Sequence, residues 1–92
     1  MKFIELINNV KDIIELEIST EENVIFVERY TKMQDYLQKL AEAYKLDKMN
    51  KGNVCLNIVR MLNHGDSEQL VNAVTELNHY YQKNIYQDNR QS

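Results

Sequence analysis

Large apolar residues recur at every third or fourth position along much of this chain, and the sequence contains no proline. An α-helix turns about 100° per residue, so this spacing gathers the apolar side chains on one helix face. Proline would interrupt such helices, and its absence leaves the pattern continuous. The chain is therefore predicted to be an all-α domain in which amphipathic helices bury their apolar faces against one another. The three clearest apolar series are Phe3, Leu6, Ile7, Val10, Ile13 and Ile14; Phe26, Tyr30, Met33, Leu37, Leu40 and Tyr44; and Leu70, Ala73, Val74, Leu77 and Tyr81.

Four helices are predicted within one domain of residues 1–86, arranged as a small antiparallel four-helix bundle with a short third helix. Residues 23–27 are also typical of a strand, because they include four consecutive apolar residues. A helix is favoured there, since the apolar series continues through Phe26 and no second strand is available for pairing. The polar residues 87–92 are predicted to fray. The expected helices span residues 3–17, 21–46, 54–63 and 67–86.

Capping residues define the expected ends of these helices. Ser19 and Glu22 have the spacing of a capping box, so Ser19 is predicted to cap the second helix. Gly65 is expected to end the third helix in a left-handed conformation, because glycine has no Cβ to oppose that conformation. Asp66 or Ser67 is then predicted to cap the fourth helix.

Charge is unevenly distributed along the chain, whose formal net charge is −3. Residues 1–28 carry seven acidic and two basic side chains, whereas residues 29–60 carry three acidic and seven basic ones. A mildly acidic chain is a poor general ligand for phosphate backbones, because affinity grows with the number of cationic contacts. Nucleic acid is therefore not the expected partner. A nucleic-acid-associated accessory protein that uses the basic middle segment is kept as the alternative function.

The expected location of the protein is the cytoplasm. No stretch reaches the roughly 18 uninterrupted apolar residues of a transmembrane segment, and the early acids Glu5 and Asp12 argue against a signal peptide. The single cysteine, Cys55, cannot form an internal disulfide and is expected to be buried and inert in a reducing compartment. Asn, Ile, Lys and Tyr, which AT-rich codons encode, make up 33 of the 92 residues. This composition favours a low-GC bacterium, its phage or its plasmid as the source.

Residues suited to catalysis or metal binding are few. Glu76 and His79 form a Glu-x-x-His pair, the spacing with which helical residues ligate metal in di-iron bundles. Such a site needs a second pair and two further glutamates, and His79 falls opposite the apolar series, so a surface histidine is expected. His64 is expected to stabilise the end of the third helix, because no Ser, Cys or carboxylate is placed to form a catalytic pair with it. We therefore predict no enzyme activity, catalytic residue, metal or cofactor.

Some apolar residues fall outside the predicted helix stripes. Val24 points away from the stripe of the second helix and Ile25 lies at its edge, while Leu56 and Val59 lie off the Ile58 face of the third helix. Exposed apolar surface usually marks an interaction site, although a neighbouring helix is the alternative cover. Tyrosine is also enriched at interfaces, and one tyrosine lies off the second stripe. The predicted protein-binding residues are Val24, Ile25, Tyr36, Leu56 and Val59.

These observations predict a non-catalytic protein that binds another protein or itself, acting as a regulator, inhibitor or immunity-type protein. In size, charge and helix order, the chain resembles the immunity proteins against pediocin-type bacteriocins. The likeness rests on those three properties alone, and no residue is assigned a role through it.

Overall fold

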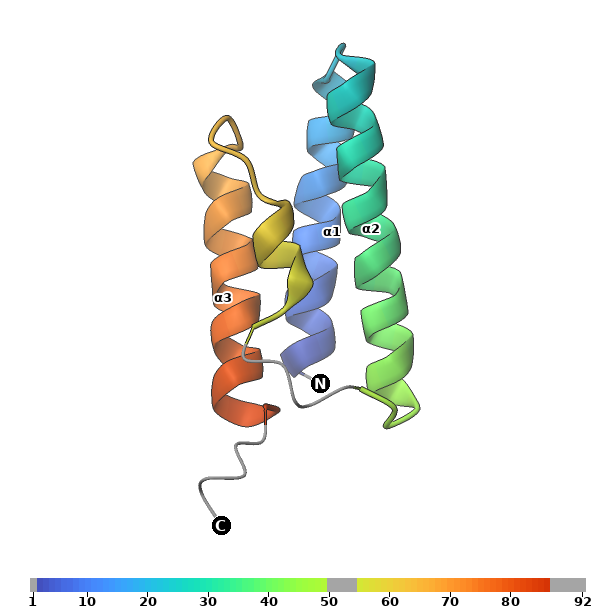
Figure 1. Ribbon diagram of the computed structural model, residues 1–92, viewed down its shortest axis with the longest axis vertical. Helices are drawn as coiled ribbons and strands as arrows, with labels where there is room; N and C mark the ends of the chain where they lie inside the picture. Colours follow the sequence, from blue (N-terminus) through green and yellow to red (C-terminus); the bar gives the residue numbers. More distant parts are fainter. Residues whose placement is uncertain (1, 50–54, 87–92) are drawn as a thin grey trace.

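The computed structural model describes residues 2–49 and 55–86, which form three α-helices and one 3₁₀-helix. α1 spans Lys2–Thr20, α2 spans Val24–Lys45 and α3 spans Glu68–Asn84, while the 3₁₀-helix η1 covers only Asn57–Met61. Figure 1 shows α1 and α2 as an antiparallel hairpin, with α3 beside α1. The described residues contain no strand, so the predicted all-α class is confirmed and residues 24–27 are helical. The predicted tail 87–92 lies outside the described residues.

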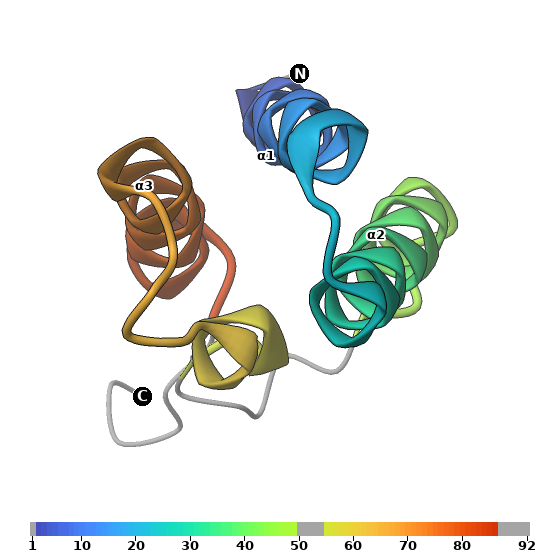
Figure 2. The ribbon, with the colours of Figure 1, turned by 90° about the horizontal axis from the view of Figure 1, so that it is seen from above.

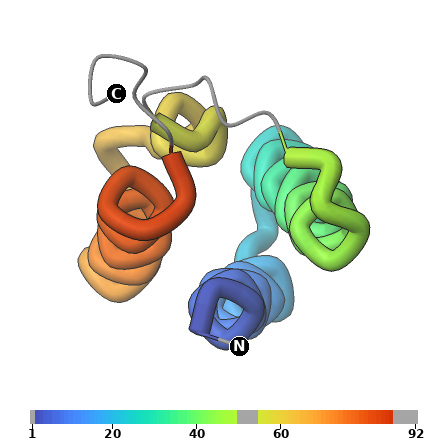
Figure 3. Tube along the Cα trace, turned by 90° about the horizontal axis from the view of Figure 1, so that it is seen from below, coloured from blue at the N-terminus to red at the C-terminus, as the bar shows by residue number. Residues whose placement is uncertain are grey.

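The four elements occupy the corners of a square when the molecule is viewed along its helices (Figures 2 and 3). α1 packs against both α2 and α3, and η1 contacts α2 and α3 from the opposite side. The prediction of four helices is wrong, because the corner expected to hold a helix at 54–63 holds a single 3₁₀ segment of five residues. Only three α-helices therefore enclose the core, and η1 closes its fourth side.

Acceptors on neighbouring helices explain why η1 begins where it does. The backbone N–H of Leu56 donates to Oδ1 of Asn78 at 2.8 Å, and the N–H of Asn57 donates to the hydroxyl of Tyr36 at 3.2 Å. No side chain of the segment itself caps η1. Residues of α2 and α3 thus satisfy the donors that a local cap would otherwise satisfy. The β-branched Ile58 and Val59 add little intrinsic helix propensity to so short a segment.

The core lies between the three helices and η1. Leu37 and Leu77, each central in its predicted stripe, are fully buried. Full burial of one such side chain stabilises the fold by about 1.5–3 kcal/mol. The apolar faces of α1 and α3 are buried as predicted, which confirms the helical phase of both. The buried residues are Phe3, Leu6, Ile7, Val10, Ile13, Ile14, Tyr30, Met33, Leu37, Leu40, Ala41, Leu56, Ile58, Leu70, Ala73, Val74, Leu77 and Tyr81.

The turn between α1 and α2 differs from the predicted capping box. α1 continues through Thr20, and the hydroxyl of Ser19 donates back to the carbonyl of Leu16 at 2.7 Å. Asn23 caps α2 instead, with its Oδ1 accepting from the N–H of Ile25 at 2.9 Å. A serine near a helix end can satisfy its hydroxyl on the preceding turn, which removes it as a cap for the next helix.

The predicted left-handed glycine is also wrong. Gly65 has no positive φ, because η1 ends at Met61 and Gly65 lies in the following loop and not at a helix terminus. The left-handed residue is Asp47, with a φ of 55° directly after α2. The N–H of Lys48 donates to the carbonyl of Ala43 at 2.8 Å, which closes a Schellman motif. Asp is one of the few residues besides glycine that adopt this conformation readily.

Candidate functional site

Exposed apolar residues are concentrated in the segment where α1 passes into α2; this turn lies at one end of the molecule (Figure 1). Of the five large apolar residues exposed in the described part of the chain, four lie within residues 16–26. Ile25 is 71% exposed, and Phe26 is 40% exposed. The fifth, Leu46, lies just past the opposite end of α2. We call the first group the tip residues; they are Leu16, Val24, Ile25 and Phe26.

The α1–α2 hairpin extends beyond the start of α3 (Figure 1), so the first turn of α2 has no third helix beside it. Phe26 lies on the same face of α2 as Tyr30 and Met33, both of which are buried. One turn of helix, about 5.4 Å, separates Phe26 from Tyr30. The expectation that the core stripe of α2 includes Phe26 is therefore only partly correct. The helix phase holds, but no third helix covers this first turn of α2.

An ion pair marks the boundary between covered and uncovered parts of α2. The guanidinium of Arg29 donates from both terminal nitrogens to the carboxylate of Asp66 and from Nη1 to the carbonyl of Met61 at 2.9 Å. It also lies over the ring of Tyr30, 4.7 Å from the centroid. Burial lowers the pKa of Arg29, but the hydrogen bond and charge of Asp66 outweigh burial, so its pKa is raised. Arg29 therefore stays charged and holds the loop after η1 against α2.

Asp66 serves this loop and not the cap of α3. Its side chain is almost fully buried, and Oδ2 accepts from the N–H of Asn63 at 2.8 Å. Ser67 caps α3, with its hydroxyl accepting from the N–H of Leu70 at 3.2 Å. This resolves the predicted choice between Asp66 and Ser67. His64, expected at a helix end, is exposed in the loop between η1 and α3.

A hollow of about 200 Å³ lies between the tip and this loop. Phe26 and Tyr30 contribute its apolar wall, and Glu21, Arg29 and Asp66 contribute charged atoms. The remaining lining residues, Asn63, His64 and Gly65, belong to the loop. The hollow therefore adjoins the exposed ring of Phe26 and extends the tip surface toward the Arg29–Asp66 pair.

Acidic residues are concentrated in the segment that contains the tip. Residues 12–28 contain six acidic side chains and no basic one. Asp12 and Glu28 are exposed, and α1 has no basic residue in its last turn. Helix C-termini favour cations, so acids near the end of α1 have no local helix-dipole benefit. Glu21 has a local structural role, because its Oε2 accepts from the N–H of Asn23 at 3.1 Å.

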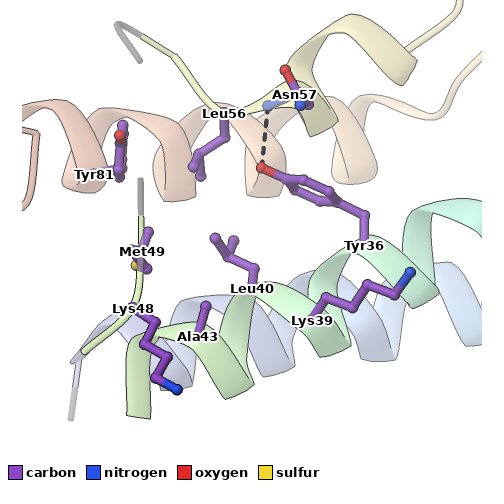
Figure 4. Close-up of a pocket in the computed structure, with 9 residues that line it drawn as sticks. All are labelled: Tyr36, Lys39, Leu40, Ala43, Lys48, Met49, Leu56, Asn57 and Tyr81. Atoms are coloured by element: carbon purple, nitrogen blue, oxygen red, sulfur yellow. Dashed lines mark hydrogen bonds between the residues drawn. The ribbon is translucent and has the colours of Figure 1, made fainter. Parts of the chain in front are cut away.

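The structure divides the five predicted protein-binding residues into two groups. Val24 and Ile25 are exposed at the tip. Leu56 is 4% exposed, so the expectation that it forms surface is wrong, whereas Val59 is half-buried and packs against the core. Tyr36 is half-buried, and its hydroxyl binds the N–H of Asn57 (Figure 4). Neighbouring elements thus cover Leu56, which is the alternative to an exposed surface, and the hydroxyl of Tyr36 joins α2 to η1.

Figure 4 shows a second hollow, of about 300 Å³, between α2 and the start of η1. Leu40 and Ala43 line its α2 side, and Leu56 and Tyr81 line the other. Burial raises the pKa of Tyr36, while the hydrogen bond from Asn57 opposes that increase. Residues 50–54, which connect Met49 to Cys55, lie outside the described chain, and we assign no ligand to this hollow.

The remaining candidate residues do not converge on one site. His79 and Glu76 are both exposed on α3, beside Lys2 and Lys83 in a shallow surface depression. The two ammonium groups oppose binding of a metal cation there. Among the described residues, no group of three or more His, Cys, Asp or Glu side chains is placed to hold a metal. Cys55 is half-buried, so the expectation of full burial is wrong.

Leu16 and Phe26 were missing from the predicted surface. Leu16 lies off its helix stripe, but its sequence position did not indicate that no neighbour would cover it. Phe26 has the spacing of a core residue, and nothing local indicates where the covering helix begins. The run of acids without a base in residues 12–28 was the available signal. Charged residues are rare on helix faces that a neighbour covers and common on exposed faces.

The tip combines exposed apolar side chains with exposed carboxylates in the same segment of the chain. The chain matches no protein-family model, no curated protein and no solved structure. Within residues 2–49 and 55–86, none of the helices has both the length and the apolar character needed to span a membrane. The case for a function therefore depends on the tip and its surroundings.

Proposed function

We propose that this protein is a non-catalytic regulator, inhibitor or immunity-type protein that binds another protein through the tip of its α1–α2 hairpin. One observation carries the proposal: four large apolar side chains are exposed within the segment 16–26, where α1 ends and α2 begins. Isolated exposed apolar residues are common, but several gathered at one place usually mark an interaction surface. Binding would remove this apolar area from water, at a gain of about 25 cal/mol per Å².

The tip is held in a defined shape before any partner arrives. Asn23 caps the first turn of α2, on which Val24, Ile25 and Phe26 lie. One turn further on, Arg29 ties α2 to the loop that precedes α3. A surface fixed in this way loses little conformational freedom on binding, which favours affinity. Because the tip is already folded, a partner can recognise the end of the hairpin directly, and binding requires no folding step.

Nucleic acid is the less supported partner. Arg29 belongs to the basic segment, but its guanidinium is bound by Asp66 inside the molecule. The lysines of α2 are spread along the helix, and α2 contains no arginine besides Arg29. Phosphate recognition usually draws on clustered arginines and bidentate contacts. The apolar tip, in contrast, has a simple use in protein binding.

The proposal is tested by affinity capture with Ile25→Asp and a matched control, Leu46→Asp. Both changes place a carboxylate on an exposed apolar position of the α2 region, at opposite ends of the helix. Proteins captured from the source cell by the unmodified chain should be lost with Ile25→Asp and retained with Leu46→Asp. Circular dichroism should show the same helical signal for all three proteins. An unchanged set of captured proteins with Ile25→Asp would refute binding through the tip.

A further inference from the structure

We infer that the tip binds a basic amphipathic segment of a different polypeptide, meaning an apolar stripe flanked by Lys or Arg. This inference rests on the proposed function and specifies the chemistry of the partner. The arrangement of charge around the apolar side chains supports this inference, together with the hollow beside Phe26.

Each side of the tip has a carboxylate on the same helix face as its exposed apolar residue. Asp12 precedes Leu16 by four positions on α1, and Glu28 follows Val24 by four positions on α2. Side chains four residues apart on a helix are neighbours. A ligand that covers Leu16 or Val24 therefore also approaches a negative charge.

These carboxylates have no internal cation. Within the described residues, the only ion pair is the one between Arg29 and Asp66. None of the six acids of residues 12–28 takes part in it, although Glu21 accepts a backbone hydrogen bond. Like charges collected on one end repel one another and destabilise the free protein slightly. Cations supplied by a partner would relieve this repulsion and would accelerate association at low salt.

A second copy of the chain is a poorer occupant of the same surface. A two-fold symmetric dimer places the same patch of each copy against the other. The acids beside Leu16 and Val24 would then face acids beside Leu16 and Val24 of the second copy. Juxtaposed like charges oppose association. Nucleic acids and anionic lipid surfaces are disfavoured for the same reason.

The hollow between Phe26 and the loop before α3 supplies a place for an anchoring side chain. It adjoins the exposed ring of Phe26 and has Glu21 on its edge. Binding energy in protein interfaces is concentrated where a large side chain fills a pocket. A segment with an apolar anchor and adjacent basic residues matches both the apolar wall and the carboxylate.

The first test selects peptides from a phage-displayed random library on the immobilised chain, after removing those that bind Val24→Ser/Ile25→Ser. Both positions are exposed, so the double variant should keep its fold, which its helical signal verifies. The peptides that depend on the tip should be enriched in Lys and Arg, depleted in Asp and Glu, and should contain spaced apolar residues. A tip-dependent set without basic enrichment would overturn the inference and leave the proposed function standing.

The second test measures the dissociation constant of the strongest selected peptide, made synthetically. Raising NaCl from about 0.05 M to about 0.5 M should weaken binding about tenfold, because screening shortens the reach of the charges. Glu22→Gln/Glu28→Gln should weaken it about two- to tenfold. The matched control Asp35→Asn/Glu76→Gln removes two exposed acids away from the tip and should leave the constant unchanged.

The remaining outcomes separate the two proposals. Binding that is insensitive to salt and to Glu22→Gln/Glu28→Gln would overturn the basic character of the partner only. If the selection yields no peptide whose binding depends on Val24 and Ile25, the proposed function and the inference are both overturned. Sedimentation of the unmodified chain alone that shows association, abolished by Val24→Ser/Ile25→Ser, would identify a second copy as the occupant and overturn the inference.

Discussion

Leu37 and Phe26 lie on the same face of α2, yet Leu37 is fully buried and Phe26 is 40% exposed. α2 packs against α1 and η1, and Leu37 belongs to the buried core that these elements enclose. The beginning of α2, which includes Phe26, lies beyond the start of α3 (Figure 1). The difference teaches that an apolar position on a helix becomes a core residue only where a second and a third element reach it.

The change from covered to uncovered takes place within one turn of α2. Tyr30 is buried beneath the guanidinium of Arg29, which Asp66 holds in place. Four residues earlier, the ring of Phe26 is open to solvent on one side. The partly buried ion pair of Arg29 and Asp66 thus lies at the boundary of the closed, packed part of the molecule, and the tip lies beyond this boundary.

The largest expected effect on stability comes from shortening side chains in the packed core. Leu37→Ala and Leu77→Ala should each reduce the free energy of unfolding by about 2–5 kcal/mol, because each leaves a cavity in a packed core. Phe26→Ala should cost only about 1 kcal/mol, since water already reaches the ring. Urea unfolding followed by circular dichroism measures all three. A loss at Phe26 as large as that at Leu37 would remove the distinction between the two regions.

The next largest effect on stability is expected at the ion pair between the packed core and the tip. Arg29→Met should cost about 1.5–3 kcal/mol, because it leaves the buried carboxylate of Asp66 without its cation. Arg29→Met/Asp66→Asn should recover part of that loss, since the amide of asparagine keeps an acceptor for the N–H of Asn63 without a charge. The double-mutant cycle is read from the same unfolding curves. A loss of unfolding free energy in the double variant that equals the sum of the losses in Arg29→Met and Asp66→Asn would show that the two side chains do not stabilise the fold as a pair.

A smaller effect is expected where η1 is attached to the closed part. Tyr36→Phe removes the acceptor of the Asn57 N–H and should cost about 0.5–1.5 kcal/mol. Hydrogen exchange at Asn57 should accelerate, while exchange in the centre of α1 should change only as far as global stability does. Tyr44→Phe, on the same helix, is the control. Equal exchange at Asn57 in both variants would show that the hydroxyl does not hold η1.

Alkaline pH tests the same closed region through its tyrosines. Burial raises the pKa of Tyr30, Tyr36 and Tyr81 in the folded protein. The folded state then holds these protons more tightly than the unfolded state, whose tyrosines titrate near pH 10. Their contribution is present in full below about pH 10 and is lost as the pH rises through the folded-state values. Urea unfolding at about pH 9 and about pH 11 should show this decline, reduced in Tyr36→Phe.

The smallest effect on stability is expected at the tip. Ile25→Asp should change the free energy of unfolding by less than about 0.5 kcal/mol, because the position is exposed. The new carboxylate lies in the first turn of α2, where the helix dipole favours it. Thermal melting measures this change. A loss above about 2 kcal/mol would mean that the tip is part of the packed core.

Periodicity, which depends on residues three and four positions apart, correctly predicted the class of the fold and the buried faces of α1 and α3. Leu37 and Leu77 were placed in the core for this reason, and Ser67 was among the predicted caps because its signal is also local. Local signals were less decisive at the α1–α2 turn, where Ser19 and Asn23 compete as caps. The hydroxyl of Ser19 bonds within α1, and Asn23 caps α2.

Which apolar faces are covered depended on contacts between distant residues. Arg29 meets Asp66 across 37 positions, and Leu56 meets Asn78 across 22. The first contact ends the closed region just below Phe26, and the second helps turn the expected third helix into the short η1. Helix spacing states which side of a helix is apolar. It does not state how far a neighbouring helix extends along that side, because burial is a property of the packed arrangement and not of any single segment.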